Sequence, residues 1–253
     1  MPFLDDASAY SALVAPVVDR VAISGYNAVS RDEMTALRGE HRFHPAALGL
    51  IAGMLCAGPI TKAEYSELMR YQHFGTTEQF LSGLSDRGAI TVKNENGGDG
   101  SMVATPEAIE VAQAVASLQA ASVTKLFAPR SASLSELRAL ITRCRQAAMA
   151  DPISTLSRLA GRAWLPADAS DAAHIWDTCI VLRLHRSDAH ATAWAEAGLT
   201  AMEMKALEPG TVRDAIEVRT NVLAATPWIG LTVDERVTLL AGLGALPGTG
   251  SPI

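Results

Sequence analysis

Aromatic residues are scarce in this sequence, whereas small and aliphatic residues are abundant. Phe, Trp and Tyr make up 5% of the 253 residues, and hydrophobic residues of all kinds make up 49%. Ala and Leu are strong helix formers, while β-sandwiches depend on aromatic and β-branched residues. The length allows one large domain or two small ones, each with a substantial core. The composition therefore predicts a mostly α protein.

Cysteine is also scarce, because the chain has only Cys56, Cys144 and Cys179, which lie far apart. Three widely spaced cysteines do not form a disulfide framework, and the sequence has no CxxC pair that would indicate a metal site. We expect buried free thiols.

Positive charge is in deficit, with 21 Lys and Arg against 27 Asp and Glu. A net charge of −6 argues against a general binder of polyanions, which needs clustered basic residues. The first residues, "MPFLDDASAY", do not resemble a signal peptide, and no run reaches membrane-spanning length without charge or proline. We expect a cytoplasmic protein without a membrane partner.

Motifs for nucleotide and serine-hydrolase chemistry are absent as well. The sequence contains no GxGxxG turn after a predicted strand, no P-loop and no GxSxG elbow. It therefore predicts no cofactor.

The first half of the chain has a recognisable order of predicted elements. A buried helix starts near residue 46 and ends at Gly58, and Thr61 with Glu64 forms a capping box for a short helix. A further helix ends near Gly88, a hairpin surrounds the loop "NENGGDGS", and Thr105 caps another helix. The order is helix, turn, helix, hairpin, helix.

With this order, residues 46–118 resemble the MarR-type winged-helix module, in which the second short helix reads DNA and the hairpin wing contacts the DNA backbone. The resemblance implies a DNA surface made of Thr76, Thr77, Gln79, Arg87 and Lys93. Two departures argue against DNA binding, since the helix lacks the usual Arg and Lys and the wing loop lacks Arg. Residues 60–100 carry four basic and six acidic residues. Nucleic-acid binding is therefore possible but disfavoured.

A polar segment, "APRSASLSE", suggests a linker at 128–136 between an N-terminal winged-helix domain, 1–127, and a C-terminal helical domain, 137–253. A weak internal echo relates "AGPITKAEYSEL" to "AGLTAMEMKAL" in the second domain, which predicts tandem helix-turn-helix units with the second lacking a wing. The alternative is that Ala- and Leu-rich helices look alike by chance.

The segment "IVLRLHRSDAHATAWAEAGLT" lies in a long helix predicted from about Asp171 to Gly198. Its LRxHRxDxH run before an AGL turn resembles an actinobacterial helix-turn-helix family of largely unassigned function. That resemblance implies a fold and no reaction.

The same helix carries the candidate site. Residues three and four apart share a helix face, so Asp188 can orient His185 as a general base. Arg183 and Arg186 could hold a carboxylate, and His190, Trp194 and Tyr71 could complete a pocket for an anionic ligand. The alternative is a buried polar network or a solvated helix face.

A metal site is a further alternative, in which His41 and His44 join His185 and Asp188 on one ion. The spacing matches no recognised zinc or iron pattern, and His190 lies about 140° round the helix from the pair. We predict no metal.

The sequence thus predicts a small-metabolite-binding protein of winged-helix type that has lost DNA binding. If it is an enzyme, the chemistry is cofactor-independent proton transfer in specialised metabolism, such as isomerisation, cyclisation or hydrolysis. One alternative is a ligand-responsive transcriptional regulator of MarR type, and another is a protein-interaction module.

Overall fold

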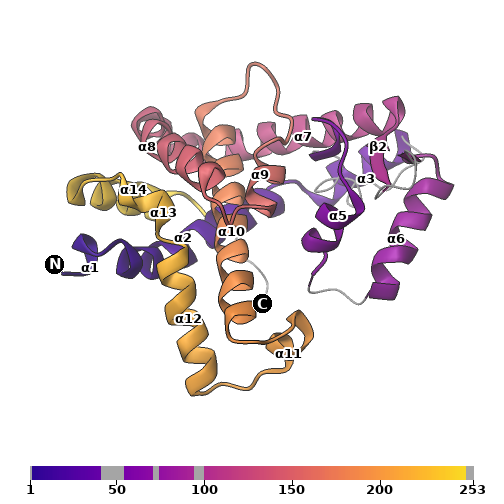
Figure 1. The fold of residues 1–253 in the computed structure, drawn as a ribbon. Helices are drawn as coiled ribbons and strands as arrows, with labels where there is room; N and C mark the ends of the chain where they lie inside the picture. The colour runs from indigo at the N-terminus through magenta and orange to yellow at the C-terminus, as the bar shows by residue number, and fades with distance from the viewer. Residues whose placement is uncertain (1, 41–53, 71–73, 94–99, 249–253) are drawn as a thin grey trace. The chain divides into compact units, whose positions relative to one another are not determined.

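The computed structural model describes residues 2–40, 54–70, 74–93 and 100–248 (Figure 1). It is mostly helical, with 74% helix and, in the part described, one two-stranded antiparallel sheet. This confirms the predicted mostly α class, whereas the tandem winged-helix arrangement stays a prediction. Among the described helices, none is both long and apolar enough to cross a membrane.

The chain divides into two compact units, which we call the large and the small unit. The large unit contains residues 1–28, 122–161 and 169–253, and the small unit contains residues 29–121 and 162–168. This division differs from the predicted one, because the first 28 residues belong with the C-terminal half. Two hydrogen bonds connect these segments: Tyr10 donates to the carbonyl of Arg236 at 2.9 Å, and the Trp176 indole donates to that of Ala22 at 3.0 Å.

From residue 61 on, the small unit keeps the predicted order of elements. Its helices and strands are α3 (Arg31–Glu40), α5 (Lys62–Leu68), α6 (Phe74–Asp86), β1 (Ile90–Lys93), β2 (Ser101–Ala104) and most of α7 (Pro106–Phe127). The two strands pair in antiparallel register, with Ile90 opposite Ala104. Most of the helix predicted near residue 46 lies outside the described residues, as does the loop between the strands.

Local signals account for the ends of these elements. The Thr61 hydroxyl accepts the N–H of Glu64 at 3.1 Å, and the Glu64 carboxylate accepts the N–H of Thr61 at 2.8 Å, so the predicted capping box is confirmed. Gly88 follows α6 with φ of +70°, a left-handed conformation that favours glycine at a helix end.

The large unit is a group of helices around α10 (Asp171–Glu196). The others are α1 (Pro2–Asp5), α2 (Ala7–Asn27), α8 (Ser131–Ala150), α9 (Leu156–Ala160), α11 (Ala201–Ala206), α12 (Thr211–Leu223), α13 (Thr226–Ile229) and α14 (Val233–Ala245). Helix α10 packs against α8, α2, α12 and α9. Ser170 caps it, and Gly198 follows its end with φ of +76°, close to the predicted bounds.

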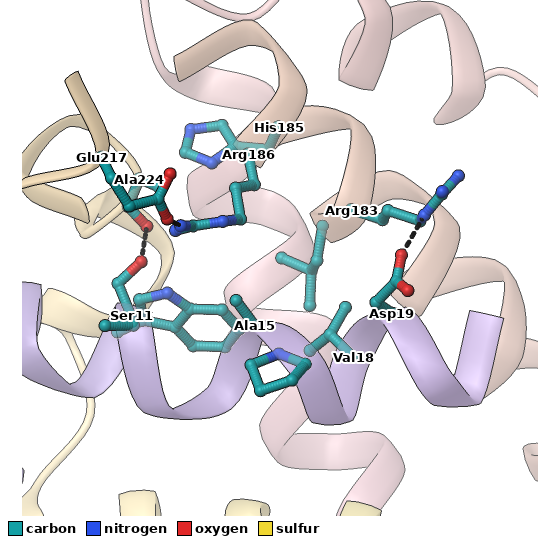
Figure 2. Close-up of a pocket in the computed structure, with 13 residues that line it drawn as sticks. Ser11, Ala15, Val18, Asp19, Arg183, His185, Arg186, Glu217 and Ala224 are labelled. Carbon is teal, nitrogen blue, oxygen red and sulfur yellow. Dashed lines mark hydrogen bonds and ion pairs between the residues drawn. The ribbon is translucent and has the colours of Figure 1, made fainter. Parts of the chain in front are cut away.

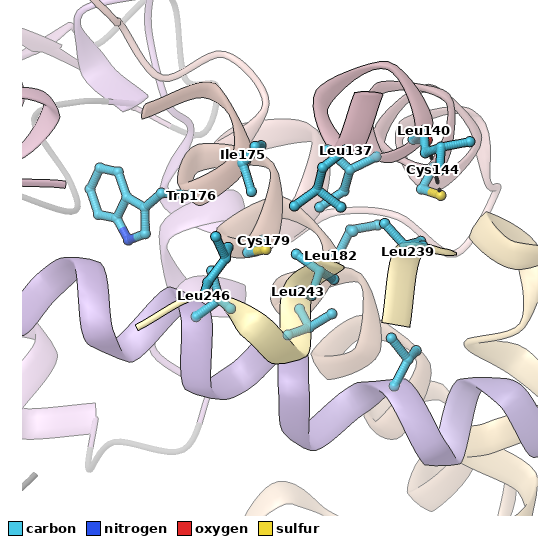
Figure 3. Packing of buried hydrophobic residues seen from close by; sticks show 14 of the residues in the cluster. Leu137, Leu140, Cys144, Ile175, Trp176, Cys179, Leu182, Leu239, Leu243 and Leu246 are labelled. Atoms are coloured by element: carbon cyan, nitrogen blue, oxygen red, sulfur yellow. Dashed lines mark hydrogen bonds between the residues drawn. The ribbon is translucent and has the colours of Figure 1, made fainter. Parts of the chain in front are cut away.

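The core of the large unit contains leucines of α8 and α14, valines of α2, and Ile175, Trp176 and Leu182 of α10 (Figure 3). Cys144 and Cys179 are fully buried in this core and are free thiols, whereas Cys56 in the small unit is half-buried. Burial raises the pKa of Cys144 to about 12, so the thiol stays protonated and behaves as a small apolar side chain.

The predicted linker at 128–136 is helical. Residues Ala128–Arg130 form a 3₁₀ turn, and α8 begins at Ser131. Pro129 lies at the start of the turn, where its missing N–H costs no hydrogen bond, and Leu134 is buried in the core. The polar residues of this segment therefore belong to the exposed start of a helix and not to a linker.

Candidate functional site

A pocket in the large unit lies against α2, α10 and α12 (Figure 2). Its volume of about 360 Å³ is in the range of small-molecule sites. Part of its wall is apolar and comes from Ala12, Ala15, Pro16, Val18, Leu182, Ala224 and Trp228. The polar part comes from Ser11, Asp19, Arg183, His185, Arg186 and Glu217. Three of the predicted site residues, His185, Arg183 and Arg186, are therefore brought together at one pocket.

His185 forms a buried pair with Asp151, the residue that follows α8. The Nε2 atom of His185 lies 3.1 Å from Oδ2 of Asp151, and the two residues are 1% and 6% exposed. The other oxygen of Asp151, Oδ1, accepts the N–H of Ile153 at 3.1 Å. The carboxylate thus fixes both the turn after α8 and the orientation of the imidazole ring.

The environment keeps His185 neutral and Asp151 ionised. Burial lowers the pKa of His185, and the hydrogen bond and charge of Asp151 offset this only in part. Burial acts to raise the pKa of Asp151, but hydrogen bonds from Thr226, the N–H of Ile153 and His185 outweigh it and hold that pKa below its usual value. The proton of the neutral ring therefore belongs on Nε2, which donates to Asp151, and Nδ1 carries the lone pair.

The hydrogen bonds that the structure describes for the Asp188 carboxylate are with the start of α9, whereas the helix pattern predicted His185 as its partner. The carboxylate accepts the backbone N–H groups of Thr155 at 3.0 Å and of Leu156 and Ser157 at 3.2 Å each, together with the Ser157 hydroxyl at 3.2 Å. These N–H groups begin α9 and have no partner within the helix. Asp188 shares the buried face of α10 with His185, as predicted, and acts on it through its charge, which raises the pKa of His185.

Both arginines of the pocket already hold a carboxylate. Nε of Arg183 donates to Asp19 of α2, and Nη2 of Arg186 donates to Glu217 of α12. Nη1 of Arg186 also donates to the side-chain oxygen of Asn221 at 2.8 Å. The guanidinium groups are therefore parts of ion pairs at the pocket wall, where the sequence suggested two cations ready for an anion.

The remaining predicted residues lie elsewhere. His190 and Trp194 are half-buried and do not line this pocket, and Trp194 packs against a cluster that contains Met204 and Ile216. Tyr71, His41 and His44 lie outside the described residues. Within the described ranges, no group of three or more His, Cys, Asp or Glu side chains could hold a metal ion.

The residues of the predicted DNA surface belong to the small unit. Thr76, Thr77 and Gln79 are in α6, Arg87 follows its end, and Lys93 ends β1. Gln79, Arg87 and Lys93 are exposed.

Asp151 is the site residue that sequence reasoning missed. The signal was the Asp-Pro dipeptide at Asp151 and Pro152, which follows a helix and favours a turn. That signal indicates a turn, but it does not indicate which side chain the carboxylate meets 34 positions later.

No family model, no curated protein and no solved structure matches the chain.

Proposed function

We propose that this protein binds a small molecule in the pocket of the large unit and withdraws a proton from it with Nδ1 of His185. The observation that carries the proposal is that His185 lines the pocket while its Nε2 is bonded to the buried carboxylate of Asp151 at 3.1 Å. This arrangement leaves the basic nitrogen of the ring for the ligand. It is the arrangement of a general base held in one tautomer by a carboxylate.

The charge of the pair supports this chemistry. A histidine whose pKa is lowered is deprotonated at neutral pH and is ready to accept a proton. When Nδ1 takes the proton, the imidazolium that forms is stabilised by Asp151 at 3.1 Å and by the nearby charge of Asp188. The transfer consumes no oxidant or reductant, so it suits isomerisation, cyclisation or hydrolysis without a cofactor.

Hydrogen exchange into a mixture of small molecules tests the proposal. The protein is incubated in D₂O with a small-molecule extract of the cells that make it, and mass spectrometry follows deuterium uptake by each compound. We expect one compound or one compound class to gain deuterium with the unmodified protein and at least about tenfold more slowly with His185→Gln. His190→Gln is the matched control, since His190 is on the same helix and does not line the pocket. Equal uptake with His185→Gln and the unmodified protein would contradict the proposal.

DNA binding is a second candidate function. The observation that favours it is the order α5, α6, β1, β2, α7 in the small unit, with the exposed cations Arg87 and Lys93 after α6 and at the end of β1. A ligand-responsive regulator of MarR type would use these residues on the DNA backbone. A salt-sensitive shift of its own upstream DNA in an electrophoretic assay would support this function, and the absence of any shift at low salt would exclude it.

A further inference from the structure

The charges at the pocket wall are balanced and arranged in two pairs. Arg183 with Asp19 connects α10 to α2, and Arg186 with Glu217 connects α10 to α12. Figure 2 shows the two pairs on different sides of the pocket, with Ala15 and Val18 between them. A ligand that carries only a negative charge would approach each arginine beside a carboxylate and be repelled by it. A ligand that carries only a positive charge would approach each carboxylate beside an arginine and be repelled by the arginine.

The wall also offers a hydrogen-bond acceptor that is not a carboxylate. Pro16 is inside α2 and has no N–H, so the carbonyl of Ala12, four residues earlier, does not receive its helix hydrogen bond. Ala12 and Pro16 both line the pocket. This carbonyl and the carboxylate of Glu217 are acceptors for a group with several N–H bonds.

The arginines retain donors for a carboxylate even while they are paired. A guanidinium group has five N–H bonds in a planar fork. Arg183 uses Nε for Asp19, and Arg186 uses one N–H of each Nη for Asn221 and Glu217. The remaining N–H bonds can hold a ligand carboxylate without breaking either ion pair.

We infer that the pocket takes a zwitterion, a small molecule with an ammonium group, a carboxylate and an apolar body of the size of an amino-acid side chain. The ammonium group meets Glu217 and the Ala12 carbonyl, which leaves Nδ1 of His185 as the base, and the carboxylate meets the free N–H bonds of the arginines. The apolar body packs on Ala15, Leu182 and Trp228. Each ligand charge then faces its opposite, which limits the cost of removing it from water. The inference rests on the proposed function and names its substrate class.

Three commercial compounds with one carbon skeleton test this inference: L-phenylalanine, 3-phenylpropanoate and 2-phenylethylamine. Ligand-observed NMR titration of the full chain at pH 7.5 gives a dissociation constant for each. We expect L-phenylalanine to bind at least about tenfold more tightly than either singly charged compound, since one charge-assisted hydrogen bond accounts for about that factor. Equal binding by 3-phenylpropanoate or by 2-phenylethylamine would overturn the inference, as would undetectable binding of all three.

A pocket-filling variant separates this inference from the proposed function. Ala12 is exposed on the pocket wall, so Ala12→Phe fills the space with little effect on the core. If a singly charged compound binds best and Ala12→Phe abolishes its binding, the zwitterion is wrong while the pocket remains a ligand site. If binding of the preferred compound survives Ala12→Phe, the pocket is not the site, and the proposed function fails together with the inference.

Neutral variants of the acidic residues test the placement of the ammonium group. Glu217→Gln should weaken the binding of L-phenylalanine about tenfold. The binding of 3-phenylpropanoate should stay unchanged or become tighter, because the carboxylate that repels it is gone. Glu235→Gln is the matched control, since Glu235 also pairs with an arginine, Arg143, and does not line the pocket. Equal affinity of L-phenylalanine for Glu217→Gln and Glu235→Gln would contradict the placement.

Discussion

Nε2 of His185 lies 3.1 Å from Oδ2 of Asp151, and this hydrogen bond connects the middle of α10 to the turn after α8. Both side chains are buried, yet His185 is part of the pocket wall. A histidine that lines a pocket and has one nitrogen fixed by a carboxylate is suited to proton transfer. The pair should therefore affect the titration of His185, the stability of the protein and hydrogen exchange into the ligand.

Asp151→Asn should lower the pKa of His185 further. The carboxylate raises that pKa through its charge and its hydrogen bond, while burial lowers it, so removing the charge leaves burial less opposed. A pH titration of the His185 Cε1 proton by NMR measures the change. Asp168→Asn is the control, because Asp168 is exposed and belongs to the small unit. A His185 pKa that stays the same or rises in Asp151→Asn would contradict the assigned pair.

The free energy of unfolding should fall as the pH is lowered, because His185 binds a proton more readily in the unfolded chain. The pKa of His185 is lowered in the folded state from its ordinary 6.5, so between the two values the unfolded chain binds more protons. Stability therefore rises with pH across this window, and the contribution of His185 is lost as the pH falls from about 6.5 towards the folded pKa. The corresponding window of Asp151 lies below its ordinary 3.8 and does not overlap.

Urea unfolding at pH 7.5, 6.5 and 5.5 measures this dependence in the unmodified protein and in His185→Gln. We expect the variant to have a weaker pH dependence. His174 also has a pKa lowered mainly by burial, but it is present in both proteins, so the difference between them isolates His185. The same slope in both proteins would show that His185 does not titrate as assigned.

Asp188→Ala should destabilise the protein by about 2–4 kcal/mol, because three backbone N–H groups at the start of α9 lose their acceptor in a buried place. Urea unfolding measures the loss. Glu203→Ala removes an exposed capping residue from α11 and should cost less. If Asp188→Ala costs no more than Glu203→Ala, the carboxylate does not hold α9.

The positions of the helices and of His185 were predictable, because they depend on local signals. The cap at Ser170, the capping box at Thr61 and the glycine at Gly198 fix helix ends through neighbours in the sequence. Helical spacing also placed His185 and Asp188 on one face, and both are buried.

The partners of these residues were not predictable, because they come from distant parts of the chain. The bonds of Asp188 go to residues more than 30 positions earlier, and the pairing of Arg183 with Asp19 spans 164 positions. Helical spacing does not predict contacts between distant parts of the chain. Composition was likewise misleading at 128–136, since a serine-rich segment with a proline suits an exposed helix start as well as a linker.

Binding to random-sequence duplex DNA should be weak even at low salt. Arg87 and Lys93 are exposed, but the segment around them has more acidic than basic residues, so few phosphate contacts are available. Electrophoretic mobility at about 50 mM salt measures this, with the double variant Arg87→Gln and Lys93→Gln beside the unmodified protein. A tight shift that the double variant loses would favour the regulator over the ligand-binding enzyme.

Arg236 should be a major determinant of stability despite having no role at the pocket. It is 5% exposed, and its guanidinium donates to the carbonyls of Leu4 at 2.6 Å, Asp5 at 3.1 Å and Trp228 at 3.0 Å, so it joins the ends of α1 and α13. It also lies 5.6 Å from the centre of the Tyr10 ring, a cation–π contact.

Arg236→Met keeps much of the side-chain volume and removes every donor. Since the three carbonyls would then be left buried without this partner, we expect a loss of about 3 kcal/mol or more in urea unfolding. Arg219→Met is the matched control, because Arg219 pairs with Glu196 at the exposed surface and such pairs contribute little. A loss in Arg236→Met no larger than in the control would mean that water replaces the guanidinium at these helix ends.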